Sequence, residues 1–415
     1  MSSAEAARPT PLPNRAVLFH IGLMKTGTTG LQNAATALRP ELLAQGVRYP
    51  GRSVNHRSAV NDFMGHSWGW GTTPVAGAWA KLRQEIDRDT ENKIWICHEF
   101  GANADDATAA RWHEELGERA HVVVTLRGYG SLLPSVWQQT TKEGDRWPFE
   151  TWLTEMLSDE PSEDLRPFTD RHDQGAVVTR WAKAFGPENV TVVVVDKSTP
   201  TLLFDAFEAM LGLEPGLLGT AELDAKASNR GMSVEEAEFH RVLNLRLRDQ
   251  LTWLEYCKWF RDSASTSLLR RRRPGPHDTR LVLPRWAAER ADERAYRYAE
   301  QISAAGVRVV GDLELLTAPA PSVEDPVMTA DVVPIDAAVE ALLGVMRQGR
   351  RDEARLDAAR TELEQVRADL TRTRAELKKA RSGREAASSR SLDEASGREL
   401  AHELRARVGR RLHRG

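Results

Sequence analysis

The 415-residue chain has little cysteine, no long apolar run and almost no net charge. Its two cysteines, Cys97 and Cys257, are too few for a disulfide framework or a four-ligand zinc site, and they suit a reducing compartment. No stretch of about 18 apolar residues is present, so the sequence predicts no membrane span. A formal net charge of -3 provides no general attraction for nucleic acid. Any anion site must therefore be a local one.

The first residues of the sequence do not predict a secretory signal. Residues 1–15 are rich in Ala and Pro and contain no apolar core of the kind that such a signal needs. We expect these residues to form a disordered leader, and we expect a cytoplasmic protein that makes no contact with nucleic acid.

Short apolar runs typical of fully buried strands recur along the chain. They cover residues 16–21, 93–97, 121–126, 190–195 and 306–312. Segments with helical spacing separate them. One is expected over residues 233–260, opened by a capping box of Ser233 and Glu236, and another over residues 285–305. Strands that alternate with helices predict an α/β domain over residues 16–317, in which helices cover both faces of a parallel sheet.

The C-terminal quarter has a different composition. Residues 318–336 contain several prolines and acidic residues, which is typical of a linker. Beyond it, leucines recur every seven residues at Leu356, Leu363, Leu370 and Leu377, with Ala, Val or Thr three positions after each. This heptad pattern predicts a coiled coil over residues 337–382, and hence a homo-oligomer. The alternative is a lone charged helix, because the intervening positions are small or polar.

Basic residues gather in two places. From residue 351 to the end there are 17 Lys and Arg against 12 Asp and Glu, a net charge of +5, and residues 383–415 are expected to form a basic, partly disordered tail. The segment 405–414 has two interpretations: weak contact with an anionic membrane surface, or simple solvation, which we favour. The run of arginines within residues 269–276 is expected to be a solvated loop.

A loop rich in Gly and Thr follows the first predicted strand. It leads into apolar residues at helical spacing, and backbone N–H groups at a helix start suit a phosphate or sulfate. Kinase-type loops place Lys directly after the second Gly, whereas here Thr28 follows Gly27 and the lysine is Lys25. Lys25 alone suits a donor that has only one phosphate beside the group to be transferred. Transfer from such a donor requires no metal.

The segment HIGLMKTGTTGLQ, residues 20–32, resembles the sulfotransferases that use 3′-phosphoadenosine 5′-phosphosulfate (PAPS), especially bacterial members related to carbohydrate sulfotransferases. A second match is LRGYGSLLPSVWQQ, residues 126–139, and the resemblance extends over residues 17–316 without covering the tail. It implies a P-loop-like three-layer α/β fold. It also implies transfer of a sulfuryl group from PAPS to a hydroxyl or amine, with 3′-phosphoadenosine 5′-phosphate (PAP) as the other product.

The resemblance further implies where the donor binds. The loop residues expected to contact it are Lys25, Thr26, Gly27, Thr28 and Thr29. Lys25 would act in catalysis, because a cation there stabilises the charge that develops on the departing 5′-phosphate.

A second set of residues is expected at the 3′-phosphate of the donor. Arg127 stands at a strand end and Ser135 on the next helix, and Arg offers a bidentate fork to a phosphate. Arg230 and Gly231 are the local candidates for a third segment that reaches this phosphate. A turn before a capped helix explains these two residues equally well.

Transfer to a hydroxyl or amine needs a base to remove the acceptor proton. His98 and Glu99 end the apolar run KIWICHE, where the resemblance implies a His or Glu base. We favour Glu99 and keep His98 as its rival, since alternation along a strand would let only one of them face the donor. The structural alternative is that Glu99 caps the next helix while His98 packs in the interior.

The candidates for acceptor contacts are His56, His66, Trp68 and Trp70. They lie in a segment rich in Gly, His and Trp, and Trp faces beside polar groups suit a sugar ring or an aromatic alcohol. Trp68 and Trp70 could equally cover the core. The acceptor class stays open among carbohydrate, lipid-linked and small-molecule hydroxyl compounds. Two other functions compete: a P-loop-type kinase or nucleotide phosphotransferase, and a non-catalytic coiled-coil scaffold with a vestigial nucleotide fold.

Overall fold

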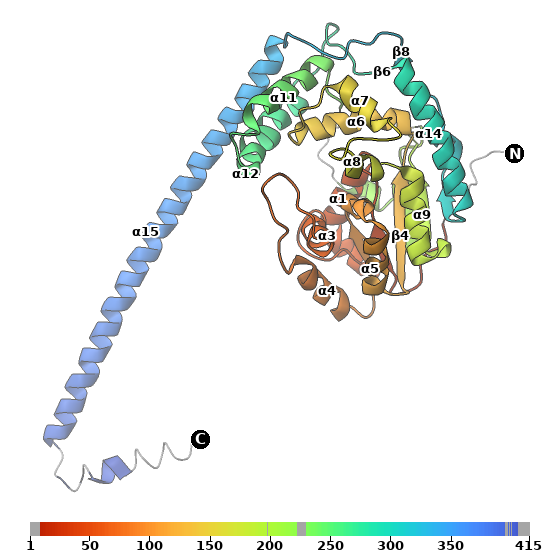
Figure 1. Cartoon of the computed structure of the whole chain (residues 1–415). Coiled ribbons are helices and arrows are strands. Elements are labelled where there is room, and N and C mark those ends of the chain that lie inside the picture. Colours follow the sequence, from red (N-terminus) through yellow and green to blue (C-terminus); the bar gives the residue numbers. More distant parts are fainter. Residues whose placement is uncertain are drawn as a thin grey trace. The chain divides into compact units, whose positions relative to one another are not determined.

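A computed structural model of the chain describes residues 9–196, 198–221, 230–394, 397, 399 and 401–405. The chain divides into two compact units, Met1–Val345 and Met346–Gly415, and the boundary falls within the long helix α15 (Ile335–Glu394) (Figure 1). Every helix among the described residues is too short or too polar to cross a membrane.

A six-stranded sheet forms the centre of the first unit, and all of its neighbouring strands run parallel. In spatial order the strands are β2 (Val47–Arg48), β3 (Lys93–Cys97), β1 (Val17–His20), β4 (Ala120–Leu126), β5 (Val190–Val194) and β7 (Arg308–Val310). The five predicted strands are confirmed. The two-residue β2 was not predicted, because so short a strand leaves no apolar run in the sequence.

Helices cover both faces of this sheet. One face carries α1 (Thr28–Ala37), α2 (Arg39–Ala44) and α10 (Leu202–Leu211), with η3 (Leu218–Thr220) beside them. The other carries α3 (Arg57–Met64), α4 (Ala78–Arg88), α5 (Asp106–Leu116) and α9 (Gln174–Phe185). Strand β1 shows why both layers form: Leu18 packs against the first group while Val17 and Phe19 pack against the second. The predicted α/β class with a covered parallel sheet is therefore confirmed.

A largely helical region continues the first unit. It contains α6 (Tyr129–Lys142), α7 (Phe149–Met156), α8 (Arg166–Asp170), α11 (Val234–Leu247), α12 (Trp253–Tyr256), the π-helix η4 (Cys257–Ser265), α13 (Thr266–Arg271) and α14 (Arg285–Ala304). Short 3₁₀ turns lie at η1 (Glu99–Asn103), η2 (Pro187–Asn189) and η5 (Leu313–Leu316). Helix α14 packs along α9, as Figure 1 shows, and so joins this region to the sheet layers.

The first unit is longer at both ends than the predicted domain of residues 16–317. Leu12 is buried, and its N–H donates to the carbonyl of Met210 at 2.7 Å, so part of the predicted leader packs on the core; residues 1–8 lie outside the described residues. Within the predicted linker, β8 (Ser322–Val323) pairs with β6 (Leu283–Pro284). The first turns of α15 are also buried in this unit at Ala337 and Ala341.

One of the two predicted helices differs in extent from the helix observed. The capping box of Ser233 and Glu236 is present, but α11 ends at Leu247, and a second capping box at Thr252 starts the next helical segment. This segment continues into nine residues of π-helix. The π-helix is a rare geometry that the spacing of apolar residues does not predict. The segment 285–305 is helical as predicted, in α14.

The arginine run in residues 269–276 is not wholly a solvated loop, because Arg272 is buried. Its guanidinium donates to Glu236 at 2.8 Å, to Asp278 at 2.7 Å and to Asp336 at 2.8 Å. The neighbours Arg271 and Arg273 are exposed. A buried carboxylate at Glu236 requires such partners, and the sequence of the run itself does not show which arginine supplies them.

We expect Arg272→Ala to destabilise the protein by about 3 kcal/mol or more, because it leaves the Glu236 carboxylate buried with one cation fewer. Arg273→Ala is the matched control, and it should change the free energy of unfolding by no more than about 0.5 kcal/mol. Urea unfolding followed by circular dichroism measures both. Equal midpoints for the two variants would show that the buried ion cluster contributes nothing to stability.

The second unit begins inside α15, whose 60 residues span about 90 Å. The four heptad leucines are each about half exposed. Helix α15 continues to Glu394 and thus includes the start of the predicted tail. Residues 401–405 are also helical, whereas the rest of the predicted basic segment, residues 406–414, lies outside the described residues.

Candidate active site

The Gly/Thr loop joins β1 to α1 at the carboxyl end of the sheet. Three of its residues have positive φ: Gly22 with φ 41°, Lys25 with φ 65° and Gly27 with φ 92°. A Cβ on Gly27 would lie 2.6 Å from a terminal methyl of Leu203, which would have to move, and the left-handed φ itself favours glycine at this position. Lys25 has no such freedom, and a lysine held at positive φ is a strained position of the kind found at functional sites.

A chain of hydrogen bonds fixes the loop to the three central strands. The His20 ring contacts the Cys97 sulfur through Nδ1 at 3.1 Å and Thr125 Oγ1 through Nε2 at 3.2 Å. Thr125 Oγ1 lies 2.6 Å from Thr26 Oγ1, and the Thr26 hydroxyl donates to the carbonyl of Leu23 at 2.6 Å.

Each hydroxyl has one proton, so the bond from Thr26 to Leu23 sets the direction of the whole chain. Thr125 must donate to Thr26, and His20 Nε2–H must donate to Thr125. Burial lowers the pKa of His20 to about 3 and raises the pKa of Cys97, so the ring is neutral and the thiol keeps its proton. Thr26 therefore holds the loop in place, and its side chain does not line the cleft described next.

A cleft of about 1340 Å³ opens beside this loop. Most of the predicted site residues line it, namely Lys25, Gly27, Thr28, Thr29, Trp68, His98, Glu99, Arg127, Ser135, Arg230 and Gly231. They come from the ends of β1, β3 and β4 and from the segments that follow. Residues up to about 200 positions apart in the sequence thus share one concave surface.

Arg127 and Ser135 occupy the positions that the sequence indicated. Arg127 follows β4, and its guanidinium donates to the carbonyl of Lys25 at 3.3 Å and to that of Ser131 at 2.9 Å. These bonds fix the side chain of Arg127 beside the loop and leave further N–H donors for an anion. Ser135 lies one turn further along α6, on the wall of the same cleft.

Arg230 has a different environment from Arg127. Its guanidinium forms two bonds with the buried Glu236 carboxylate, at 2.6 and 2.7 Å, and so its charge is already neutralised. Gly231 is exposed on the cleft wall, next to the side chain of Gln138. Arg230 thus holds the capping box of α11 in place, which agrees with the structural alternative for this turn.

His98 and Glu99 both line the cleft, although strand alternation predicted that only one would. The reason is that β3 ends at Cys97 and a 3₁₀ turn begins at Glu99, so the chain leaves the strand with the extended His98 as the N-cap of that turn. The structural alternative had Glu99 as the cap, but His98 caps the turn instead: His98 Nδ1 accepts from the N–H of Phe100 at 3.1 Å. The ring proton of neutral His98 is therefore on Nε2, which lies 3.9 Å from Glu99 Oε2.

The two residues differ in what they can do with a proton. Burial lowers the pKa of His98 to about 4, and its Nδ1 lone pair is occupied, so at neutral pH it has no free acceptor atom. Burial opposes ionisation of Glu99, but His98 and hydrogen bonds, including one from Gln32 at 3.1 Å, hold the pKa of Glu99 below its ordinary value. Glu99 is therefore an ionised acceptor whose orientation is fixed.

The charge on Lys25 is destabilised by its surroundings. Burial lowers the pKa of Lys25, and the nearby guanidinium of Arg127 lowers it further, while Glu143 and Glu99 oppose the shift. An anion bound between the two cations would relieve this repulsion. The loop, Arg127 and the helix start of α1 together form a site for a negatively charged group.

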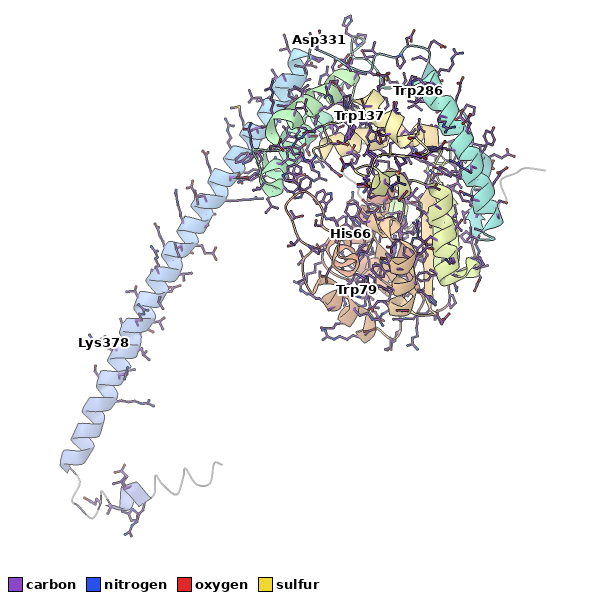
Figure 2. All side chains as sticks on the ribbon, in the orientation of Figure 1. His66, Trp79, Trp137, Trp286, Asp331 and Lys378 are labelled. Atoms are coloured by element: carbon purple, nitrogen blue, oxygen red, sulfur yellow. The ribbon has the colours of Figure 1, made fainter. Side chains whose placement is uncertain are left out.

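The four residues predicted to contact the acceptor have different environments in the structure. His56 is buried and bonds to backbone atoms of Pro50 and Cys97. His66, which is labelled in Figure 2, is exposed and does not line the cleft. Trp70 donates to the carbonyl of Leu251 and packs on Trp253 and Tyr256. Trp68 alone of the four lines the cleft, in edge contact with Trp253.

The cleft is also lined by polar residues that sequence reasoning did not select, among them Gln32, Gln138, Gln139, Lys142, Glu143, Arg261 and Arg280. Asn55 and Arg57 line it too, and they flank His56 in the segment considered for acceptor contacts. Gln32 belongs to the matched segment, so its neighbourhood gave a signal. Lys142 and Arg261 have none, because they reach the cleft from the end of α6 and from the π-helix η4, whose positions depend on the tertiary fold.

No protein-family model matches this chain, and no curated protein matches it either. The site is therefore described by the residues that line the cleft: the Gly/Thr loop with Lys25, the pair Arg127 and Ser135, and the carboxylate of Glu99.

Proposed function

We propose that the protein is a sulfotransferase that moves a sulfuryl group from PAPS to a hydroxyl or amine of a carbohydrate, lipid-linked or small-molecule acceptor. The observation that carries the proposal is the meeting of Lys25, Glu99, Arg127 and Ser135 in one cleft. The proposal includes a P-loop-like character for the β1–α1 loop, with the lysine displaced from its kinase position.

The residues present suit the donor's charges. The 5′-phosphosulfate would bind to the loop N–H groups, Thr28, Thr29 and Lys25, and the 3′-phosphate to Arg127 and Ser135. PAPS needs a second phosphate site because it carries a 3′-phosphate. ATP has no phosphate at that position and needs no such site. Arg230 is excluded from a direct charge contact in this proposal because Glu236 already pairs with it.

The chain's own groups then have distinct tasks. Glu99 accepts the proton of the attacking acceptor group, in a position fixed by Gln32. Lys25 stabilises the charge that develops on the 5′-phosphate oxygen as its bond to sulfur breaks. His98 keeps its Nε2–H toward Glu99 and positions the turn.

The test of the donor is direct. The full-length protein should bind PAP in the micromolar range or tighter by calorimetry, and it should transfer labelled sulfuryl from PAPS to members of an acceptor screen. Phosphate transfer from ATP with Mg²⁺, together with no binding of PAP, would instead favour the kinase alternative. PAP binding without transfer to any acceptor would favour the scaffold alternative.

We also propose that α15 forms a coiled coil that makes the protein a homo-oligomer. The half-exposed leucine stripe supports this, because an isolated helix gains nothing from a regular apolar seam. Leu363→Glu with Leu370→Glu should lower the mass measured by light scattering to that of one chain, while transfer activity persists.

The matched control for the seam is Ala368→Glu with Ala375→Glu, which has the same spacing on the same helix but lies off the leucine stripe. It should leave the oligomeric state unchanged. A wild-type protein that is already monomeric, or a leucine variant with unchanged mass, would refute the seam.

A further inference from the structure

Three cations in the cleft have no part in the proposed handling of the donor. They are Arg57 at the start of α3, Lys142 at the end of α6, and Arg261 in the π-helix η4. Among the residues that the structure describes, neither Arg57 nor Lys142 forms an ion pair with a carboxylate. Arg261 pairs with its exposed neighbour Asp262 at 2.7 Å.

These cations lie close to one another. The guanidinium carbons of Arg57 and Arg261 lie 3.9 and 4.5 Å from the centroid of the Trp68 ring. Burial lowers the pKa of Arg57, and the charge of Arg261 lowers it further. Burial likewise lowers the pKa of Lys142 to about 7, and Lys25 and Arg261 add to the shift while Glu143 opposes it.

Half-buried like charges that are only partly neutralised cost free energy, so the cluster requires an explanation. Glu99 and Glu143 oppose the lowering of the Arg57 pKa, and Glu143 opposes that of Lys142. The same two carboxylates also act on Lys25, and Glu143 accepts from Gln139 at 2.7 Å, so positive charge remains in excess in this part of the cleft. The π-helix that presents Arg261 is itself an uncommon conformation that recurs at functional sites. Both features indicate that an anion from outside the chain completes the cluster.

The cluster is connected to the proposed base. The backbone N–H of Arg57 donates to Asn55 Oδ1 at 3.3 Å, Asn55 donates to Gln32 at 3.2 Å, and Gln32 donates to Glu99 at 3.1 Å. The Glu99 carboxylate also opposes the lowering of the pKa of the Arg57 guanidinium, and both side chains line the cleft. An anion held by Arg57 would thus lie on the side of the cleft where Glu99 takes its proton, which favours an anion carried by the acceptor.

We propose that the acceptor carries a negatively charged group, a carboxylate, sulfate or phosphate, and that Arg57, Lys142 and Arg261 bind this group beside the hydroxyl or amine that Glu99 activates. The inference rests on the proposed sulfotransferase function and specifies the substrate class of the same cleft. Trp68, which both arginines contact, holds the two guanidinium groups in place through cation–π contact.

The test uses the full-length protein saturated with PAP and acceptor pairs that differ in one charge. Suitable pairs are uronic acid oligosaccharides with their carboxyl-reduced forms, hydroxybenzoates with hydroxybenzyl alcohols, and sugar phosphates or sugar sulfates with the unsubstituted sugars. Calorimetry gives the two dissociation constants of each pair. In at least one pair the charged member should bind tenfold more tightly or better, and the pair that shows this identifies the anion.

Arg57→Gln should reduce that preference to threefold or less, and Arg261→Gln should do the same. Arg52→Gln is the matched control, since Arg52 is exposed in the same segment and does not line the cleft; it should keep the preference of the native chain. Binding of PAP to the Arg57 variant shows whether the variant is folded and whether the donor site is separate.

The outcomes of this test separate the inference from the proposed function. No preference for a charged member in any pair, or a preference that survives both arginine substitutions, overturns the anionic acceptor even if PAP binds and neutral acceptors are sulfated. Weaker PAP binding in Arg57→Gln with unchanged acceptor preference overturns it too, because the cluster would then serve the donor. Failure of the native protein to bind PAP would instead overturn the sulfotransferase proposal.

Discussion

Lys25→Ala should lower the rate of sulfuryl transfer by about 10²-fold to 10³-fold or more, the usual effect of removing one preorganised group from a developing negative charge. The lysine lies in the cleft at the start of α1, where burial and Arg127 already lower its pKa. Alanine keeps a Cβ at the same left-handed backbone position, so the strain at φ 65° is the same in both proteins. The loss therefore measures the ammonium group.

Lys81→Ala is the matched control, because Lys81 is exposed on α4. Single-turnover transfer from labelled PAPS compares the two variants with the native protein. A Lys25 variant within tenfold of the native rate would remove the loop lysine from catalysis. Thermal melts of both variants, followed by circular dichroism, exclude an unfolded sample as the cause.

Glu99→Gln should lower turnover by about 10²-fold to 10⁴-fold, the range observed for loss of a general base, while PAP still binds. Glutamine has the same shape and can keep the hydrogen bond with Gln32, so the cleft should stay intact. The comparison variant is His98→Asn, which retains an acceptor atom for the N–H of Phe100. An active Glu99 variant beside an inactive His98 variant would reverse the assignment of the base.

The pH profile of kcat/KM has a predictable sign for this base. Glu99 works when ionised, and its pKa lies below the ordinary 4.5, so the rate should remain constant from neutral pH down to that value and decline only below it. The same carboxylate contributes to stability at pH values above its unfolded-state pKa, and this contribution is lost as the pH falls through the folded-state pKa. A rate that halves well above pH 4.5 would indicate that another group controls the reaction.

The fold was largely predictable because buried parallel strands leave an unmistakable pattern. The runs that became β1, β3, β4 and β5 are largely apolar and almost wholly buried, whereas the short edge strand β7 is buried only at Val310. The apolar pattern did not predict the residue at which each strand ends. β3 stops one residue before His98, and this single boundary decides that His98 and Glu99 share a cleft.

The site was predictable where its residues are close in sequence to a buried strand. Lys25, Glu99 and Arg127 each follow the carboxyl end of such a strand, and parallel strands bring these ends together. Lys142 and Arg261 belong to the cleft through helix packing between segments far apart in the chain. Arg272 shows the same limit, since only the folded chain distinguishes it from its exposed neighbours.

The hydrogen-bond chain through His20 has a consequence for the thermodynamics of donor binding. The chain ties Thr26 to strand β4 through Thr125 and contains no group that a ligand supplies. The conformational entropy of ordering the loop is therefore lost when the protein folds, and little of it remains to be lost when a donor arrives. Donor binding at this loop should accordingly be favourable in enthalpy with only a small ordering penalty, and the heat-capacity change should reflect the surface buried by the nucleotide alone.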